Sequence, residues 1–359
     1  MIINARSPYF ITVNESGQIG SKIELFLSAG GAAIPSGETY TLSKRSPSSS
    51  QLRTDYNISQ YIREYIETIS SADSGNTIFA NVRVKRYKET SVGVFALLDT
   101  VDHLGVNGYT LYSDGYNETD ASSLFVCLAN PSIEINYQEG IESSKYPYIN
   151  AIVDFTANAS SKVDVSYKDM NGRNEVVVSY DTNAKSVIKV PVRTTSAKFD
   201  NGNTVTLNWK PAGTTVSITK TFTVKPICET KYEPIQCQFI NRFGGWQFLT
   251  FFKAKSSSIN VSSTSYNLLP DSVNYNPKRP QSGSLNVNGK QGIRLNTGWV
   301  PENYSELIQD LLLSETVLLD DVPAEIKTQS SDIKTSLKDR NINYEMEFEY
   351  AFNLINNVI

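Results

Sequence analysis

Polar and apolar residues alternate with a period of two along much of this chain, most regularly near its C-terminus. From Asn341 to Phe352 every second residue is apolar, namely Ile342, Tyr344, Met346, Phe348, Tyr350 and Phe352. Because neighbouring side chains of a strand point to opposite faces, this run predicts a β-strand of about 40 Å with one buried face. A shift by one residue would expose the aromatic side chains and bury three glutamates, so we expect a fixed register.

Helical periodicity is confined to two segments. Residues 58–66 place their apolar side chains on one face of a short helix, which Ser59 can cap. A second apolar stripe follows Pro301, a residue suited to the first turn, and predicts a helix over residues 302–314. The other patterned segments, such as residues 77–88, are short and alternating, so they predict strands joined by turns.

These patterns predict a mainly β, multi-domain fold. A chain of 359 residues exceeds the size at which one hydrophobic core keeps growing. Residues 1–130 are predicted to form an N-terminal β domain with one short helix. Residues 131–226 have short strands at regular spacing, which is typical of an immunoglobulin-like β-sandwich. Residues 227–359 predict a C-terminal antiparallel sheet or barrel with the helix 302–314 packed against it.

Two segments of the C-terminal region have unusual compositions. The turn Asn241-Arg242-Phe243-Gly244-Gly245-Trp246 separates two predicted strands, and its paired glycines permit a positive φ at the reversal. The passage Ser256 to Gly283 is rich in serine, threonine, asparagine and proline, and we expect it to cross the surface in an extended path. Such a passage either makes functional contacts or is loose in the free subunit.

The charge balance does not indicate nucleic-acid or membrane-surface binding. The chain has 33 basic and 37 acidic residues, a net charge of −4, and no long run of one sign. The cluster Arg83, Lys85, Arg86 and Lys88 could contact phosphate, but a solvated strand face is the simpler interpretation. No apolar run is long enough to span a membrane, and the N-terminus lacks the apolar stretch of a secretory signal. We therefore expect a protein that is released into the cytoplasm of the cell that makes it.

No catalytic, cofactor-binding or metal-binding arrangement is evident. His103 is the only histidine, so neither a histidine metal site nor a Ser-His-Asp triad is expected. Cys127, Cys228 and Cys237 lack metal-binding spacing, and we interpret them as buried reduced side chains in preference to a Cys228–Cys237 disulfide. Isolated carboxylates could form a glycosidase pair, but no two of them stand out. We predict a protein without enzymatic activity, cofactor or metal.

Five sequence blocks carry a likeness to a known group of proteins. They are Ser7–Glu15, Asn57–Tyr65, Asn241–Trp246, Leu295–Trp299 and Asn343–Phe352. In these blocks the chain resembles virion proteins of tailed phages that infect Bacteroidota, crAss-like phages included. The resemblance implies a structural component of the tail, such as a barrel, tube or hub, assembled as a homo-oligomeric ring around the DNA channel. It also implies synthesis in the host bacterial cytoplasm, a final location in the virion, and contacts with other proteins of the tail or portal vertex.

Six residues are candidates for a subunit interface or for the channel surface: Trp246, Tyr275, Trp299, Glu345, Glu347 and Glu349. The acidic face of the three glutamates would let genomic DNA slide past without binding, although a solvated strand face is again the simpler interpretation. The passage 256–283 could reach the next subunit of a ring, which needs heterologous interfaces whose rotation closes. The alternative function is a receptor- or glycan-binding module of a phage fibre or baseplate, with Trp209, Trp246 and Trp299 stacked on sugars.

Overall fold

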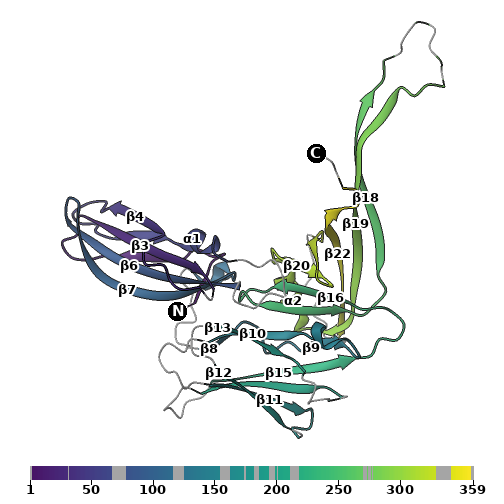
Figure 1. The fold of residues 1–359 in the computed structure, drawn as a ribbon, viewed down its shortest axis with the longest axis horizontal. Coiled ribbons are helices and arrows are strands. Elements are labelled where there is room, and N and C mark those ends of the chain that lie inside the picture. The colour runs from purple at the N-terminus through teal and green to yellow at the C-terminus, as the bar shows by residue number, and fades with distance from the viewer. Residues whose placement is uncertain are drawn as a thin grey trace.

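Strands dominate the structure, which is a computed structural model. It describes residues 2–30, 32–66, 78–115, 125–153, 162–173, 175–181, 186–193, 199, 201–210, 218–269, 273, 276, 278–328 and 341–356. Over these ranges the chain forms 22 strands in five sheets and two α-helices, which confirms the predicted mainly β, multi-domain fold. Figure 1 shows the sheets in three groups that follow one another along the chain, with a two-stranded arm projecting from the last.

The N-terminal region builds a five-stranded sheet with a short ribbon and a helix on one face. The sheet order is β1-β7-β6-β3-β4, with β1 and β7 parallel. Its strands are β1 Ile2–Asn4, β3 Gly20–Ala29, β4 Tyr40–Arg45, β6 Phe79–Ser91 and β7 Val94–Val106. The covering elements are the paired strands β2 Phe10–Val13 and β5 Thr54–Asn57 and the helix α1 Ser59–Arg63. Alternate residues of β6 from Ala80 to Val84 are buried beneath them, as predicted.

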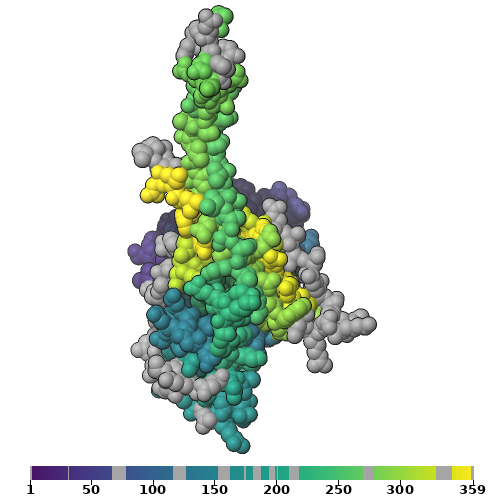
Figure 2. Space-filling view, turned by 90° about the vertical axis from the view of Figure 1, so that its right-hand side faces the viewer, coloured from purple at the N-terminus to yellow at the C-terminus, as the bar shows by residue number. Residues whose placement is uncertain are grey.

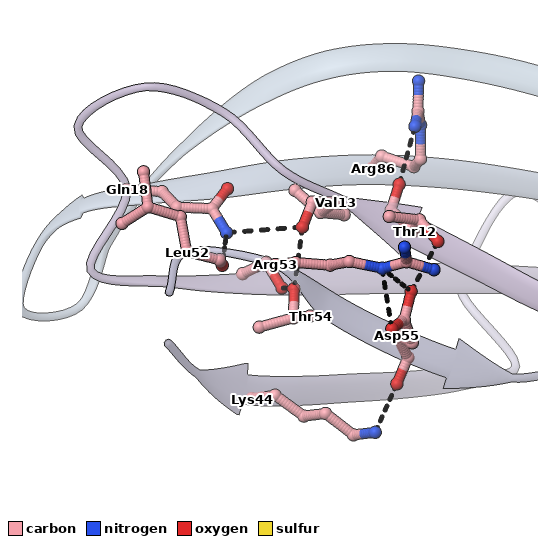
Figure 3. A network of polar contacts seen from close by, with 10 residues as sticks. Thr12, Val13, Gln18, Lys44, Leu52, Arg53, Thr54, Asp55 and Arg86 are labelled. Atoms are coloured by element: carbon pink, nitrogen blue, oxygen red, sulfur yellow. Dashed lines mark hydrogen bonds and ion pairs between the residues drawn. The ribbon is translucent and has the colours of Figure 1, made fainter. Parts of the chain in front are cut away.

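Polar side chains tie the β2–β5 ribbon to the sheet (Figure 3). Thr12 Oγ1 donates to Asp55 Oδ1 across the ribbon at 2.5 Å, and Arg53 Nε donates to the same carboxylate at 2.9 Å. Arg86 on β6 donates from Nη1 to the carbonyl oxygen of Thr12 at 2.8 Å. Its Nε donates to Asp99 on β7 at 2.8 Å. This arginine of the predicted basic cluster is therefore engaged within the domain and is not free to bind phosphate.

The middle region is a β-sandwich, as predicted. One sheet has the order β13-β10-β8 and the other the order β12-β11-β14-β15-β9, in which β15 and β9 are parallel. The strands are β8 Phe125–Cys127, β9 Ile135–Gln138, β10 Tyr148–Val153, β11 Lys162–Asp169, β12 Val176–Asp181, β13 Ser186–Pro191, β14 Asn203–Lys210 and β15 Ile218–Ile227. Side chains of both sheets share one core, for example Ile149 of β10 and Val190 of β13 from the first sheet and Val165 of β11 from the second. The domain boundaries near 130 and 226 stay predictions, and β8 pairs with β10 although it precedes the first of them.

The C-terminal region is a seven-stranded antiparallel sheet with the order β17-β16-β20-β21-β22-β19-β18. Its strands are β16 Ile235–Ile240, β17 Trp246–Phe251, β18 Ser256–Asn267, β19 Ser282–Pro301, β20 Val317–Leu319, β21 Val322–Ile326 and β22 Asn341–Asn353. The helix α2, Tyr304–Leu312, buries Leu307, Ile308 and Leu311 against the sheet, so the predicted packed helix is present. Over the residues that the structure describes in this region, β17 and β18 are the two edges, so the described strands form an open sheet and not a barrel.

The long C-terminal strand β22 carries the predicted alternating face over most of its length. Its residues Ile342, Tyr344, Met346 and Phe348 are buried in the core of the C-terminal sheet. Phe352, however, is 45% exposed. Tyr350 is only partly buried at the edge of this core, and its ring centre lies 5.5 Å from that of Phe352, so burial decreases toward the end of the strand.

The three regions share an apolar cluster that we call the junction core. It is built from side chains of all three, among them Ile2, Phe79, Leu104 and Val106, then Leu128, Ile152 and Val187, and finally Ile240, Trp246, Phe248 and Leu318. Trp246 at the start of β17 is 2% exposed within it, and its backbone N–H donates to Asn150 Oδ1 of β10 at 3.1 Å. Shared burial of this kind fixes the regions against one another.

The turn between β16 and β17 contacts both neighbouring regions through one backbone and one side-chain hydrogen bond. The Tyr109 amide donates to the carbonyl oxygen of Arg242 at 2.8 Å, and Asn241 Nδ2 donates to the carbonyl oxygen of Leu128 at 2.9 Å. A Cβ on Gly245 would lie 2.5 Å from that same oxygen. The neighbouring Gly244 has φ +81°, as the sequence predicted. Gly244 thus permits the chain reversal, and Gly245 permits the close approach to Leu128.

A polar contact joins α2 to the N-terminal region beside the junction core. Tyr109 donates from its hydroxyl to Asp310 Oδ1 at 3.0 Å, and the Arg6 guanidinium lies 5.0 Å from the centre of the Tyr109 ring. Arg6 also donates to the carbonyl oxygen of Leu313 at the end of α2 at 2.7 Å. Burial raises the pKa of the Asp310 carboxyl above its usual value.

Candidate functional surface

A two-stranded arm projects from the C-terminal sheet, as Figures 1 and 2 show. The arm consists of residues 256–269 and 278–289, that is, β18 and the first part of β19. Pairing continues outward to Asn267 and Ser282, and all twelve residues of β18 are exposed. The predicted passage across the surface is therefore wrong for this segment, because β18 leaves the body as the edge of a strand pair.

Apolar side chains of the arm are exposed on a nearly uncharged stretch. They are Ile259, Val261, Tyr266, Leu268, Leu269, Leu285 and Val287. From Ser256 to Gly289 the sequence has only three charged residues, Asp271, Lys278 and Arg279. An isolated two-stranded hairpin is marginally stable in water, and a long uncharged edge strand is a template for pairing with another chain. These properties are typical of a surface that becomes covered in an assembly.

Local features hold the arm as a twisted strand pair. The Tyr266 ring lies over Gly283, where an added Cβ would be 2.7 Å from the ring. A register shift between Ser262 and Thr264 forms an irregularity, and the facing Asn286 has φ +53°. Such bulges increase the twist of a ribbon and favour a defined direction over a loose path. These local features therefore set the twist of the strand pair, while its base is held by the pairing of β19 with β22.

The C-terminal segment covers the base of the arm. Leu354 donates its backbone N–H to the carbonyl oxygen of Gly289 at 2.8 Å. Asn288 Nδ2 donates to the carbonyl oxygen of Ile355 at 2.8 Å, and the Ile355 amide donates back to Asn288 Oδ1 at 3.1 Å. Leu354 and Ile355 are themselves exposed, which extends the apolar surface of the arm onto the body. Figure 2 shows the end of the described chain in yellow beside the base of the arm.

Two of the three predicted glutamates remain on the surface and share one partner. Glu345 Oε1 lies 3.6 Å from Nε of Arg294, and Glu347 forms an ion pair with Nη2 of the same guanidinium. Arg294 is on β19, directly opposite Glu347 in the sheet. One cation thus offsets part of the charge of both carboxylates.

The third glutamate, Glu349, is 8% exposed and more strongly held. It accepts a hydrogen bond from Asn260 Nδ2 at 2.9 Å and forms ion pairs with Lys327 at 3.0 Å and Lys290 at 3.6 Å. The hydrogen bond from Asn260, followed by that from Lys327, lowers the pKa of Glu349. Together with Arg294, the lysines make this face a mixed ion-pair ladder, which differs from the bare acidic stripe considered as an alternative to a solvated strand face.

Trp299 is 72% exposed because of a bulge in β19. The register of β19 against β22 shifts between Asn296 and Trp299, and Gly298 in the bulge has φ +72°. Ile293 and Leu295 are buried in alternation, which would carry Trp299 inward if no residue were inserted. The bulge therefore turns the indole to the surface.

A small cavity of about 50 Å³ lies beside this indole, between the sandwich and the C-terminal sheet. Its lining includes Ile227, Phe252, Thr297, Trp299, Val300 and Tyr304. Cys228, the residue after Ile227, is exposed. Asn136 and Thr250 also line it, so the wall of the cavity is part polar and part apolar. The site thus combines an uncharged cavity, a surface indole and a nearby thiol.

The other predicted residues occupy different places. Trp246 is buried in the junction core and Trp209 is 5% exposed in the sandwich core, so neither is available to a neighbouring subunit or a sugar. Tyr275 lies outside the described residues. The predicted interface residues did not include the apolar side chains of the arm. The feature of the sequence that indicates them is the near absence of charge from Ser256 to Gly289, combined with the alternating apolar residues Ile259 and Val261.

The remaining chemical candidates have structural positions. His103 is 4% exposed with its ring edge against Tyr9, at 6.0 Å between ring centres. The three cysteines are free, and Cys228 is exposed where we expected it to be buried. Within the described ranges, no group of three or more histidine, cysteine and acidic side chains is placed to hold a metal ion. No helix in those ranges is long and apolar enough to cross a membrane.

No family model and no curated protein matches this chain. Among solved structures, it is similar to one described as "Biofilm associated protein - BSP domain", with 9% sequence identity and a TM-score of 0.19. The match covers 79% of this chain and 58% of the other, so the chain spans little more than half the length of that structure. At this TM-score the similarity supports no inference about fold or function.

Proposed function

We propose that this chain is a non-enzymatic structural subunit that assembles with further copies of itself into a closed ring, using the arm to bind the next copy. In keeping with the sequence resemblance, the ring belongs to the tail of a phage virion and surrounds the DNA channel. Other proteins of the tail or portal vertex are its further partners. A ring requires a heterologous interface, in which one surface of a subunit binds a different surface of its neighbour.

The observation that carries this proposal is the arm. All twelve residues of its β18 strand are exposed and uncharged, and among the strands that the structure describes none pairs with the outer edge of β18. Natural sheet edges that stay in solvent are protected by charge, proline or short length. Covering Ile259, Val261 and Leu285 would recover hydrophobic free energy of about 1 kcal/mol or more for each side chain.

The experiment compares the full chain with a shortened-arm variant. Residues 263–287 are replaced by Asn-Gly, which closes a two-residue hairpin between Ser262 and Asn288, a directly paired position. Light scattering and negative-stain electron microscopy give the copy number of each protein. We expect a ring of fixed copy number for the full chain and monomers for the variant, with equal thermal stability of the body. A full chain that stays monomeric at high concentration, or a variant that assembles equally well, refutes the proposal.

A second candidate function is glycan or receptor binding in a phage fibre or baseplate. The observation that favours it is Trp299, whose indole is exposed beside a cavity and could stack on a sugar ring. Glycan-array binding by the shortened-arm variant, lost on Trp299→Ala, would support this candidate. Binding that is unchanged by Trp299→Ala, or absent altogether, would remove it.

A further inference from the structure

We propose that the cavity beside Trp299 is the socket for the arm of a second copy of this chain, with an apolar side chain near the end of the arm as the plug. This inference rests on the proposed function, because it names the surface that the arm binds. Leu269 is the best candidate for the plug, since it follows β18 and is 87% exposed. The cavity is apolar on several sides and has room for the terminal methyl groups of an aliphatic side chain.

The geometry makes the contact intermolecular. The arm and the socket lie at opposite ends of the same strand, with Leu285 in the outer part of β19 and Trp299 near its other end. Fourteen residues of strand separate them, which corresponds to about 46 Å. A paired strand cannot fold back over that distance, so the arm cannot fill the cavity of its own copy. Plug and socket are different surfaces, and their contact is therefore of the heterologous kind that closes a ring.

The two surfaces are matched in carrying no charge and in being part apolar. The strand β18 has no charged residue, and none of the residues that line the socket is charged. The apolar part of the socket is formed by side chains such as Phe252 and Val300, which are buried, with the exposed Trp299 indole beside them. A large aromatic residue beside buried apolar side chains is the composition of an interface hot spot. The bulge at Gly298 contributes to this contact, because it places the indole on the surface beside the cavity and keeps it out of the core.

Cysteine crosslinking tests the contact, because the native Cys228 is exposed next to Ile227 of the socket. The full chain with Leu269→Cys is treated with a short bismaleimide under assembly conditions. The matched control is Val92→Cys at the exposed β6–β7 turn, where Val92 is 77% exposed. We expect covalent oligomers with Leu269→Cys, none with Val92→Cys, and their loss when Cys228→Ser is added. Trp299→Ala should raise the concentration at which rings dissociate by about tenfold or more.

The outcomes separate this inference from the function on which it rests. Rings that form normally but give no Leu269–Cys228 crosslink, or a crosslink that persists in Cys228→Ser, overturn the socket and leave the ring intact. An assembly that Trp299→Ala does not weaken also overturns it. A full chain that remains monomeric overturns the ring and the socket together. Saturable sugar binding at Trp299 in the shortened-arm variant would assign the cavity to a glycan and overturn the inference as well.

Discussion

Replacing Trp246 by alanine should destabilise the protein far more than the same change at Trp299. Both residues lie in the C-terminal sheet, but Trp246 is 2% exposed in the junction core and Trp299 is 72% exposed. The Trp246→Ala variant keeps the backbone N–H that donates to Asn150 Oδ1, so it removes only the indole and its packing. Comparing the two variants therefore shows how much more stability an indole contributes in the junction core than at an exposed position of the same sheet.

The size of the effect follows from the burial. A tryptophan side chain buries about 200 Å² when fully covered, which corresponds to about 5 kcal/mol at about 25 cal/mol per Å². Trp246 is almost fully covered, and measured losses for tryptophan to alanine in protein cores are about 3–5 kcal/mol. Trp299 covers only about a quarter of its surface, so we expect about 1 kcal/mol or less for Trp299→Ala.

Equilibrium guanidinium unfolding, followed by far-ultraviolet circular dichroism and by tryptophan fluorescence, measures both variants. Because the junction core couples three regions, we also expect the transitions seen by the two probes to separate in Trp246→Ala, while they stay together in Trp299→Ala. Limited proteolysis should then release stable fragments from Trp246→Ala alone. A loss below about 1 kcal/mol for Trp246→Ala, or equal losses for the two variants, would refute the role assigned to the junction core.

Three further predictions test polar and backbone contacts. Burial raises the pKa of the Asp310 carboxyl in the native state, so the native protein loses stability relative to the unfolded chain as the pH rises above the usual carboxyl pKa of about 4. The urea midpoint of Asp310→Asn should therefore rise relative to that of the parent as the pH increases from that value, and a constant difference would contradict this. Gly245→Ala should lower the free energy of unfolding by about 1–3 kcal/mol, because the added Cβ would collide with Leu128. Gly37→Ala, whose Cβ would lie in open space, should have almost no effect in the same urea titrations. Glu349→Gln should lower the free energy of unfolding at neutral pH more than Glu345→Gln does, because Lys327 and Lys290 lose the charge of a nearly buried carboxylate. The difference should disappear in acid, below the lowered native pKa of Glu349, where the parent carboxyl is protonated. Equal losses at neutral pH would contradict the role of Glu349 in the ion-pair ladder.

Much of the candidate surface was not predictable from local sequence. The block Leu295 to Trp299 predicts a strand, but the bulge at Gly298 that exposes the indole depends on pairing with β22, about forty-five residues away in the chain. Glu349 shows the same limit, because its alternation places it on the polar face while Asn260, Lys290 and Lys327 from three other segments cover it there. Only the assembled sheet brings those partners together.

The sequence by itself determined the repeating local choices. The alternation of Ile342 to Phe348 set a strand with one buried face, and the paired glycines of the turn set a reversal with a positive φ at Gly244. Both depend on neighbouring residues, through side-chain direction and backbone sterics. The tertiary structure alone decided that β18 leaves the body as an arm and that Trp246 joins three regions. Those outcomes depend on which distant strands pair and which faces meet, and the free energy of such contacts exists only when the whole chain is folded.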